Sequence, residues 1–293
     1  MLANSHEERI GSVRGLVCCP SCRTPLNRNG DLVRCNTCGN DYPLAPSGQI
    51  DLRPRAPISR TVSFGVTRDP LWFDRAAMAE TNTTRDPDVA SLIPAPPPHE
   101  RWVLEIGCGN NSLRRELEAA GWNYVGVDYG AESADFLVDV HALPFGDAMF
   151  GLVVAKALLE HVRFPHLAVQ EMARVLVAGG NLIGDVAFLQ PFHHSYYHMT
   201  HAAVGDLLHS AGLRLTSCAN ERESVFTYLA RYSNLPRPAA ALLVACVYPA
   251  DLLYRVLTLL KKQLLRRRTD DRVYLAVGIS FSATKSAPAV LTG

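Results

Sequence analysis

A short apolar stretch that ends in two glycines is the part of the sequence best suited to hold a ligand. Residues 103–111 read Val-Leu-Glu-Ile-Gly-Cys-Gly-Asn-Asn, and a helical run follows over 112–120. Glycine lacks a Cβ atom and accepts positive φ, so the backbone at Gly107 and Gly109 can approach a ligand closely. The N-terminus of the following helix would offer unpaired N–H groups to polar ligand atoms.

A carboxylate stands where a second strand of the same unit would end. Asp128 closes the apolar run 123–128 and lies 21 residues beyond Gly107. An acidic side chain at that spacing suits the paired hydroxyls of a ribose. A nicotinamide-binding fingerprint would need a third glycine at position 112, where this chain has Ser112. The pattern predicts a nucleoside-binding unit and leaves the cofactor open.

Four further motifs narrow the class of protein. In chain order they occupy 139–145, with Leu-Pro-Phe at its end, then 150–154, then 159–162, which contains Glu-His-Val, and 171–182. Together with the glycine turn they resemble the class I S-adenosylmethionine-dependent methyltransferases, in the branch with an acidic–Leu-Pro-Phe motif and a Glu-His-Val loop. The resemblance covers about residues 100–218. It implies an α/β, Rossmann-like fold with a doubly wound, mostly parallel seven-stranded sheet.

The resemblance also implies roles for individual residues around S-adenosylmethionine. Asp128 would bind the ribose hydroxyls, and Asp139 would lie beside the adenine amino group with His141 near it. Asn111 stands where the family usually has a third glycine. Because asparagine tolerates the left-handed region, we expect cofactor binding to survive. The residues expected to shape the methionine and ribose end of the pocket are Glu105, Gly107, Cys108 and Gly109.

His161 is the candidate catalytic residue. It follows the fourth expected strand, on the rim where an acceptor would meet the methyl group. A histidine there could take a proton from a hydroxyl or amine nucleophile. The alternative is a histidine that only holds the loop through a hydrogen bond.

The segment 192–201 contains four histidines and two tyrosines. His194 and His198 are four residues apart, which is compatible with a metal site on a helix. Thr200, however, is a good helix N-cap, and a helix that begins there leaves these two histidines outside it. The segment resembles the aromatic loop that faces the acceptor in methyltransferases of polysaccharide and glycolipid pathways. On that basis the residues expected to touch substrate are His193, Tyr196 and Tyr197.

Two cysteine pairs near the N-terminus predict a metal site. Cys19 and Cys22 form one Cys-x-x-Cys pair, Cys35 and Cys38 form the other, and twelve residues separate them. Four thiolates suit the tetrahedral coordination of a structural Zn²⁺, whereas a redox function would need only one pair. The unit resembles the short zinc ribbons found before or beside methyltransferase domains. In the rRNA guanine methyltransferases the last ligand is usually histidine, where this chain has Cys38.

We expect three parts along the chain. Residues 1–52 would be a self-contained ribbon with its own core, so that removing its zinc should leave the cofactor affinity of the larger domain unchanged. Residues 53–100 would be a proline-rich linker with a short helix at 71–78, and 101–293 would be the methyltransferase domain. In that domain strands are expected at 101–106, 123–128, 151–155, 181–187 and 212–218, and helices at 112–120, 132–138, 166–177 and 201–211.

The segment 236–268 is an apolar and basic helical insertion before the last strand. Pro249 should kink or break the helix, and the apolar run is too short for a membrane span unless it includes Asp251 and Arg255. The favoured interpretations are a lid over the substrate pocket and an interfacial helix with the basic run 266–268 on anionic headgroups. Dimerisation and a true membrane span are the remaining alternatives. The final strand, 273–284, is expected at the antiparallel edge of the sheet.

Composition constrains the partners. The formal net charge of the 293-residue chain is +1, and residues 1–60 carry eight Arg against five Asp and Glu, which is modest for RNA binding. The polar N-terminus and the reduced-thiol pattern favour a cytoplasmic protein, with contact at the inner membrane face as a further expectation.

The function predicted from these features is methyl transfer to a small-molecule, sugar or lipid-linked acceptor. One alternative is an RNA methyltransferase that grips RNA with its ribbon. A second is a cofactor-binding scaffold that activates a partner protein.

Overall fold

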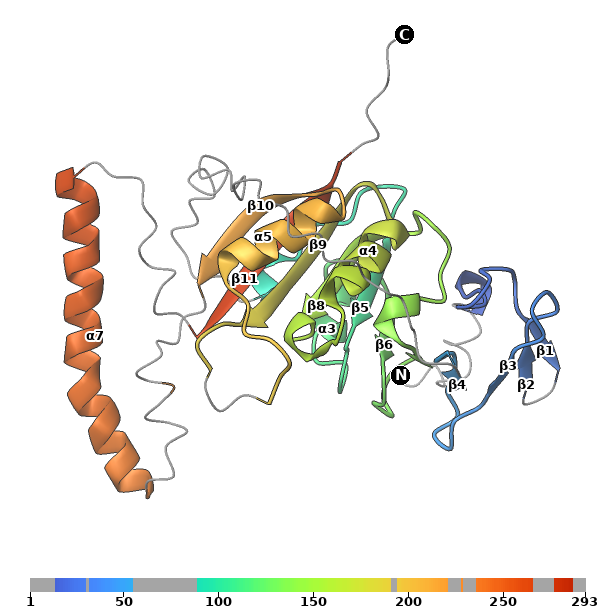
Figure 1. Ribbon diagram of the computed structural model, residues 1–293, viewed down its shortest axis with the longest axis horizontal. Coiled ribbons are helices and arrows are strands. Elements are labelled where there is room, and N and C mark those ends of the chain that lie inside the picture. The colour runs from blue at the N-terminus through green and yellow to red at the C-terminus, as the bar shows by residue number, and fades with distance from the viewer. Residues whose placement is uncertain are drawn as a thin grey trace, which may run out of the picture.

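An eight-stranded sheet forms the body of the protein (Figure 1). The computed structural model describes residues 14–29, 32–54, 89–190, 194–220, 228, 236–265 and 277–286. The strand order is β10-β11-β9-β8-β5-β6-β7-β4, with all pairs from β9 to β4 parallel and β11 antiparallel to both of its neighbours. The strands of this sheet are β4 (Ile50–Asp51), β5 (Trp102–Ile106), β6 (Asn123–Asp128), β7 (Phe136–Leu137), β8 (Phe150–Lys156), β9 (Leu176–Ala187), β10 (Leu213–Asn220) and β11 (Gly278–Lys285).

Helices cover both faces of the sheet, because the parallel strands carry apolar side chains on both sides. Along β5, Val103 packs into one buried cluster and Leu104 into the other, as the period of a strand requires. The cluster around Val103 includes Leu117 of α3, and the cluster around Leu104 includes residues of α4 and α5. The helices are α3 (Arg114–Ala119), α4 (Pro165–Val175), α5 (His201–Ser210) and α7 (Arg237–Leu265), with short 3-10 turns η1 (Arg14–Leu16), η2 (Val89–Leu92), η3 (Val140–Ala142) and η4 (Leu159–His161).

The α/β, mostly parallel architecture is confirmed, with three differences in detail. The sheet has eight strands rather than seven, because the ribbon segment contributes β4. The segment 132–138 is not a helix: Phe136 and Leu137 pair with the end of β6 as strand β7, and both are buried. The last strand, β11, is antiparallel as expected, but it lies between β9 and β10 and therefore is not at the edge.

The ribbon contains a three-stranded antiparallel sheet of β1 (Asn27–Asn29), β2 (Leu32–Arg34) and β3 (Asp41–Pro43). The expectation of a separate ribbon core is wrong. Cys35, Tyr42 and Leu52 belong to the same buried cluster as Leu104 and Phe145 of the large sheet. One continuous core therefore joins the ribbon to the domain that carries the glycine turn.

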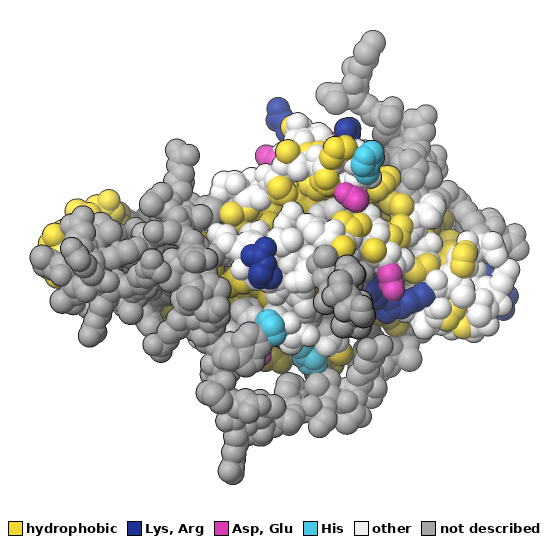
Figure 2. All heavy atoms as spheres, turned by 90° about the horizontal axis from the view of Figure 1, so that it is seen from above, with side chains coloured by type: hydrophobic (Ala, Val, Ile, Leu, Met, Phe, Trp, Pro, Cys, Tyr) yellow, Lys and Arg dark blue, Asp and Glu magenta, His cyan; other side chains and the backbone are white. Residues whose placement is uncertain are grey.

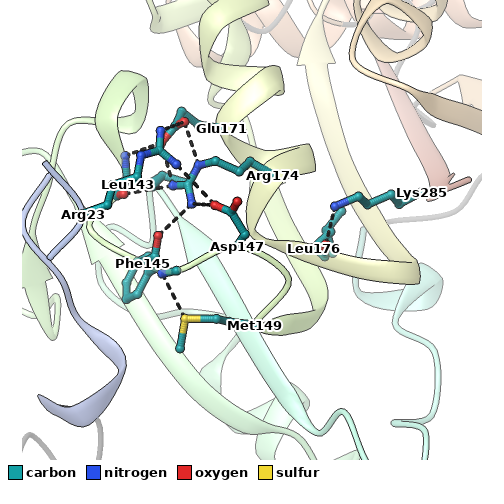
Figure 3. Close-up of polar contacts among 10 residues, drawn as sticks. Arg23, Leu143, Phe145, Asp147, Met149, Glu171, Arg174, Leu176 and Lys285 are labelled. Atoms are coloured by element: carbon teal, nitrogen blue, oxygen red, sulfur yellow. Dashed lines mark hydrogen bonds and ion pairs between the residues drawn. The ribbon is translucent and has the colours of Figure 1, made fainter. Parts of the chain in front are cut away.

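Polar contacts also join the two parts of the structure. The backbone N–H of Cys18 donates to Pro144 O at 2.7 Å. The guanidinium of Arg23 reaches Glu171 of α4 at 2.9 Å, and Arg174 holds the same carboxylate at 2.8 Å (Figure 3). Asp147 accepts from both arginines, so the four side chains form one charged cluster at the junction.

Helix α7 stands apart from the layered domain (Figure 1). It continues through Pro249, so of the two expected effects, a kink or a break, the break is wrong. Apolar side chains are exposed on more than one side of this helix, and some of them are visible at the left of Figure 2. One set of them recurs every three or four residues and is here called the exposed stripe. In the part of the chain that the structure describes, no helix is long and apolar enough to cross a membrane. The exposed stripe consists of Leu242, Cys246, Pro249, Leu253, Val256 and Leu260.

Candidate functional site

The glycine turn lies at the carboxyl end of β5, beside the end of β6. Gly107 and Gly109 adopt positive φ, +73° and +52°. The N–H groups of Gly107 and Cys108 donate to Val127 O at 2.8 and 3.1 Å, which ties the turn to β6. A Cβ on Gly107 would lie 3.0 Å from the Leu158 side chain, so this position has little room for a larger residue.

Asp128 accepts three backbone hydrogen bonds at this edge of the sheet. One carboxylate oxygen accepts the N–H of Gly109 at 3.1 Å, and the other accepts those of Gly130 and Ala131 at 2.9 and 3.0 Å. A carboxylate has roughly four acceptor positions, so the oxygen that faces the turn keeps room for a ligand hydroxyl. The half-buried Asp128 thus holds the turn and the loop that follows β6 at the same time.

The loop from residue 129 to residue 135, here called the β6–β7 loop, is also bonded to the turn. Asn111 has φ +58°, as expected for a residue in place of glycine. Its side-chain amide donates to Ser133 O at 2.5 Å, and the Ser133 hydroxyl donates back to Gly109 O. The turn and the loop therefore form one hydrogen-bonded unit around Asp128.

Glu105 lies beneath the turn and does not face open space. Its side chain is buried, and its carboxylate accepts the hydroxyl of Tyr124. Burial raises the pKa of Glu105 above its usual value. The Arg114 guanidinium lies over the Tyr124 ring, 4.2 Å from its centre, and pairs with buried Asp135 at 2.8 Å. In this structure Glu105 supports the turn from below.

Asp139 and His141 form a fixed pair at the start of η3. Asp139 accepts both the backbone N–H and the ring Nδ1 of His141, at 3.0 and 2.6 Å. His141 Nε2 accepts the N–H of Phe164 at 3.3 Å, which assigns the ring proton to Nδ1. Although burial opposes it, this pairing holds the pKa of Asp139 below its usual value. Cys108, the remaining predicted pocket residue, is buried.

The rim beside η4 brings together two of the segments singled out in the sequence. The backbone N–H groups of Tyr196 and Tyr197 donate to Glu160 O at 2.8 and 3.2 Å. The Tyr197 hydroxyl donates to Arg163 O at 2.9 Å, and both rings are exposed. His161 is exposed at the end of η4, next to this contact. His193, the third predicted substrate residue, lies outside the described residues.

The helix that follows this rim begins where the sequence indicated. The Thr200 hydroxyl accepts the N–H of Ala203 at 3.2 Å, which confirms it as the N-cap of α5. His194 and His198 precede the helix and are exposed. Among the described residues, only the four ribbon cysteines gather closely enough to hold a metal ion.

The four cysteines form a compact thiol cluster. Their Sγ atoms all lie within 4.8 Å of one another, with Cys22 3.4 Å from Cys35 and Cys19 3.6 Å from Cys38. Tetrahedral zinc with Zn–S bonds of about 2.3 Å needs sulfur atoms roughly 3.8 Å apart. The cluster therefore fits a zinc ion.

Two hydroxyl groups support the thiols. Thr24 Oγ1 lies 3.2 Å from Cys35 Sγ and is the largest of several hydrogen-bond contributions, with the backbone of Cys38 next, that lower the pKa of Cys35 to about 6. The Tyr42 hydroxyl lies 3.1 Å from Cys19 Sγ. Hydroxyl donors of this kind stabilise thiolates, the form that binds metal. Cys18 is buried outside the cluster, and burial raises its pKa.

Sequence reasoning missed several residues that shape the site. Tyr124 and Ser133 have no motif of their own, and their partners Glu105 and Gly109 lie 19 and 24 residues away. Gln49 and Arg53, which hold the β6–β7 loop from the ribbon side, were assigned no role either. The only sequence signal for Gln49 and Arg53 is that they are polar residues next to the apolar residues of a short segment at the end of the ribbon.

Residues 104–184 match the family described as the methyltransferase domain. The matched range includes the glycine turn, Asp128, the Asp139–His141 pair and η4. The chain contains a methyltransferase domain.

Two curated relatives match part of the chain. The ubiquinone biosynthesis O-methyltransferases of Pectobacterium carotovorum and Pectobacterium atrosepticum are 29% and 32% identical over 97 residues, 27% of this chain and 40% of each relative. The match thus spans two fifths of the length of these relatives. A solved S-adenosylmethionine-dependent methyltransferase from Methanosarcina mazei is 16% identical with a TM-score of 0.42, over 64% of this chain and 94% of the other.

Glu160 of the methyltransferase domain gives a testable pH dependence. Burial, with a smaller effect of Asp185, raises the pKa of Glu160 from the usual 4.5 to about 7. Between these values the folded chain holds a proton that the unfolded chain releases, so this group lowers stability as pH rises through that window. Glu160→Gln stays neutral and can still accept the N–H of Ala187.

We expect Glu160→Gln to unfold like the wild type at pH 4.5 and to be more stable by up to about 3 kcal/mol at pH 8. Urea unfolding at both pH values measures the difference. Glu118→Gln, at an exposed position of α3, is the control and should change neither value. An equal effect of Glu160→Gln at both pH values would contradict the assignment.

Proposed function

We propose that this chain transfers a methyl group from S-adenosylmethionine to a small-molecule, sugar or lipid-linked acceptor. The observation that carries the proposal is the arrangement of Asp128 with Gly107 and Gly109 at the carboxyl edge of a methyltransferase domain. That edge is where open parallel sheets bind nucleotides.

The residues present fit the cofactor. Asp128 would accept a ribose hydroxyl, Gly107 and Gly109 would allow close approach of the methionine portion, and the Asp139–His141 pair would lie beside the adenine. When bound, S-adenosylmethionine supplies a methyl group made electrophilic by its sulfonium. The remaining task of the chain is to align a nucleophile and exclude water.

The acceptor would enter across the rim formed by η4 and the tyrosine segment. Tyr196 and Tyr197 offer exposed aromatic rings, and their backbone is anchored on Glu160. His161, exposed on the same rim, would take the proton of a hydroxyl acceptor.

The cofactor site is tested through Asp128. Asp128→Ala removes a charged acceptor for the ribose, so we expect affinity for S-adenosylhomocysteine to fall by about 1.5–3 kcal/mol, roughly 10- to 100-fold. Calorimetry measures the change, and Asp206→Ala, at an exposed position of α5, is the matched control. Unchanged affinity in Asp128→Ala would place the ribose elsewhere.

Several contacts favour a small acceptor over RNA. Arg23, Arg34 and Arg53 of the ribbon side each pair with a carboxylate, which lowers the positive potential that RNA would require. The partial relatives are named for ubiquinone biosynthesis, a pathway to a small lipid-like molecule, which supports an acceptor of that size for this chain.

We also propose that the four-cysteine cluster holds one structural zinc ion. Protein prepared without chelator should contain one zinc per chain by elemental analysis. Cys35→Ser removes a buried ligand and should lose most of the metal, whereas Cys18→Ser, beside the cluster but outside it, should keep it. Wild-type protein without zinc would refute the assignment.

An amphiphilic acceptor presented at an anionic membrane is the version of this function that best accounts for α7. A lid packed on the domain would bury the apolar stripe of α7, but the stripe is exposed. The stripe, with exposed Tyr248, Leu252 and Leu257 beside it, forms a broad apolar surface that suits the headgroup boundary of a bilayer. The sequence adds cationic residues at the end of the helix and after it: Lys261, Lys262, Arg266, Arg267 and Arg268.

We expect wild-type protein to sediment with anionic vesicles at low salt. Replacing both Leu253 and Leu260 by Gln should reduce this binding about tenfold or more, because two apolar anchors are lost. Leu243→Gln, at a position turned about 100° from Leu242 around the helix axis, is the matched control and should have a smaller effect. If the wild-type protein does not bind vesicles but binds structured RNA with a steep salt dependence, RNA becomes the favoured acceptor over an amphiphilic molecule.

A further inference from the structure

The β6–β7 loop, which carries part of the proposed cofactor site, is held from two sides. The glycine turn and Asp128 hold one side. Residues 49–53, at the end of the ribbon, hold the other. Strand β4 lies in this segment and pairs in parallel with β7, with Ile50 opposite Phe136 and Asp51 opposite Leu137.

Gln49 makes the closest contact with the loop. Its side chain is fully buried, and its amide nitrogen lies 3.0, 2.6 and 3.0 Å from the carbonyl oxygens of Ala131, Glu132 and Ala134. The N–H of Ala131, whose carbonyl Gln49 holds, donates to Asp128. One ribbon side chain thus fixes the same short backbone segment that the Asp128 carboxylate uses.

Arg53 holds the beginning of the loop. Its guanidinium donates to Tyr129 O at 2.9 Å and lies 5.1 Å from the centre of the Tyr129 ring. Asp51 orients this guanidinium through contacts of 2.8 and 2.6 Å. Tyr129 directly follows Asp128, so Arg53 acts on the residue next to the proposed ribose ligand.

A short path connects these residues with the four cysteines. The Tyr42 hydroxyl touches Cys19 Sγ, and Leu44, two residues later, forms a bridge with Ile50. The N–H of Ala45 donates to Gln49 O at 2.8 Å. Cys35, Tyr42 and Ile50 also belong to one buried cluster. Packed and hydrogen-bonded neighbours thus link the thiol cluster to Gln49.

We propose that Gln49 and Arg53 are positioning residues for the cofactor site, and that zinc binding by the ribbon raises affinity for S-adenosylmethionine through them. The inference rests on the proposed function. Metal binding orders the ribbon, the ordered ribbon presents Gln49 and Arg53, and these hold the β6–β7 loop in the conformation that Asp128 requires. Because linkage is reciprocal, bound cofactor should in turn strengthen zinc binding.

The first test uses zinc-loaded, full-length protein and S-adenosylhomocysteine as the probe. Gln49→Met keeps the size of the side chain but removes its amide, and we expect affinity to fall about tenfold. Gln170→Met, at an exposed position of α4, is the matched control and should not change affinity. Hydrogen exchange should be faster in residues 129–135 of Gln49→Met and unchanged in α5. Because Arg53 is only half-buried, Arg53→Ala provides a second variant that tests the loop if Gln49→Met does not fold.

The second test compares zinc-loaded and zinc-free protein. Wild-type affinity for S-adenosylhomocysteine should fall about tenfold on zinc removal, and Gln49→Met should lose less than wild type, because one of the two side-chain links to the loop is already broken. Equal affinity of Gln49→Met, Arg53→Ala and wild type in the zinc-loaded state would overturn the positioning roles. Equal affinity of wild type with and without zinc would overturn the coupling. If zinc-loaded wild type does not bind the probe at all, the proposed function itself fails.

Discussion

The carboxylate of Asp128 is the interaction on which the candidate site depends. Parallel strands that end at one edge leave backbone N–H groups without partners there, and these groups need acceptors. Asp128 accepts three of them, from Gly109, Gly130 and Ala131. The glycine turn and the β6–β7 loop can then face each other at fixed positions. A ligand hydroxyl would meet an acceptor that is already oriented, which reduces the cost of ordering the site on binding.

The edge of the sheet beside β7 explains why the ribbon cannot be treated as a separate module. A two-residue strand such as β7 leaves unpaired backbone groups, and exposed strand edges are liabilities in natural proteins. Strand β4 pairs with β7, and the N–H of Leu52 extends the contact to Leu137 O at 2.8 Å. The ribbon thus completes the sheet, and its buried residues continue the core beneath. Changes in the ribbon can therefore act on the cofactor side without any direct contact with a ligand.

The acidic side chains around the site differ in their exposure to solvent. Asp128 keeps a partly open face, whereas Glu105 and Glu160 are buried and their pKa values are raised by burial. Each is held by a defined donor: Tyr124 for Glu105, and the N–H of Ala187 for Glu160. Glu105 supports the glycine turn and Glu160 supports the rim beside η4, and each placement costs the desolvation of a carboxyl group. Glu105 is a motif residue whose contacts in the structure are with the fold beneath the turn.

The sequence by itself determined the features that depend on near neighbours in the chain. The left-handed glycines and Asn111, the cap at Thr200 and the two Cys-x-x-Cys pairs follow from local backbone preference and spacing, and the structure contains all of them. The alternation of apolar segments was likewise enough to indicate a mostly parallel α/β sheet. Only the tertiary structure decided how the ribbon joins this sheet. Gln49 meets Ala131 across 82 residues, and neither residue carries a periodic signal that predicts the contact. The same holds for 132–138, where pairing with β6 and β4 prevailed over a helical pattern, because burial of Phe136 and Leu137 in the core outweighs local propensity.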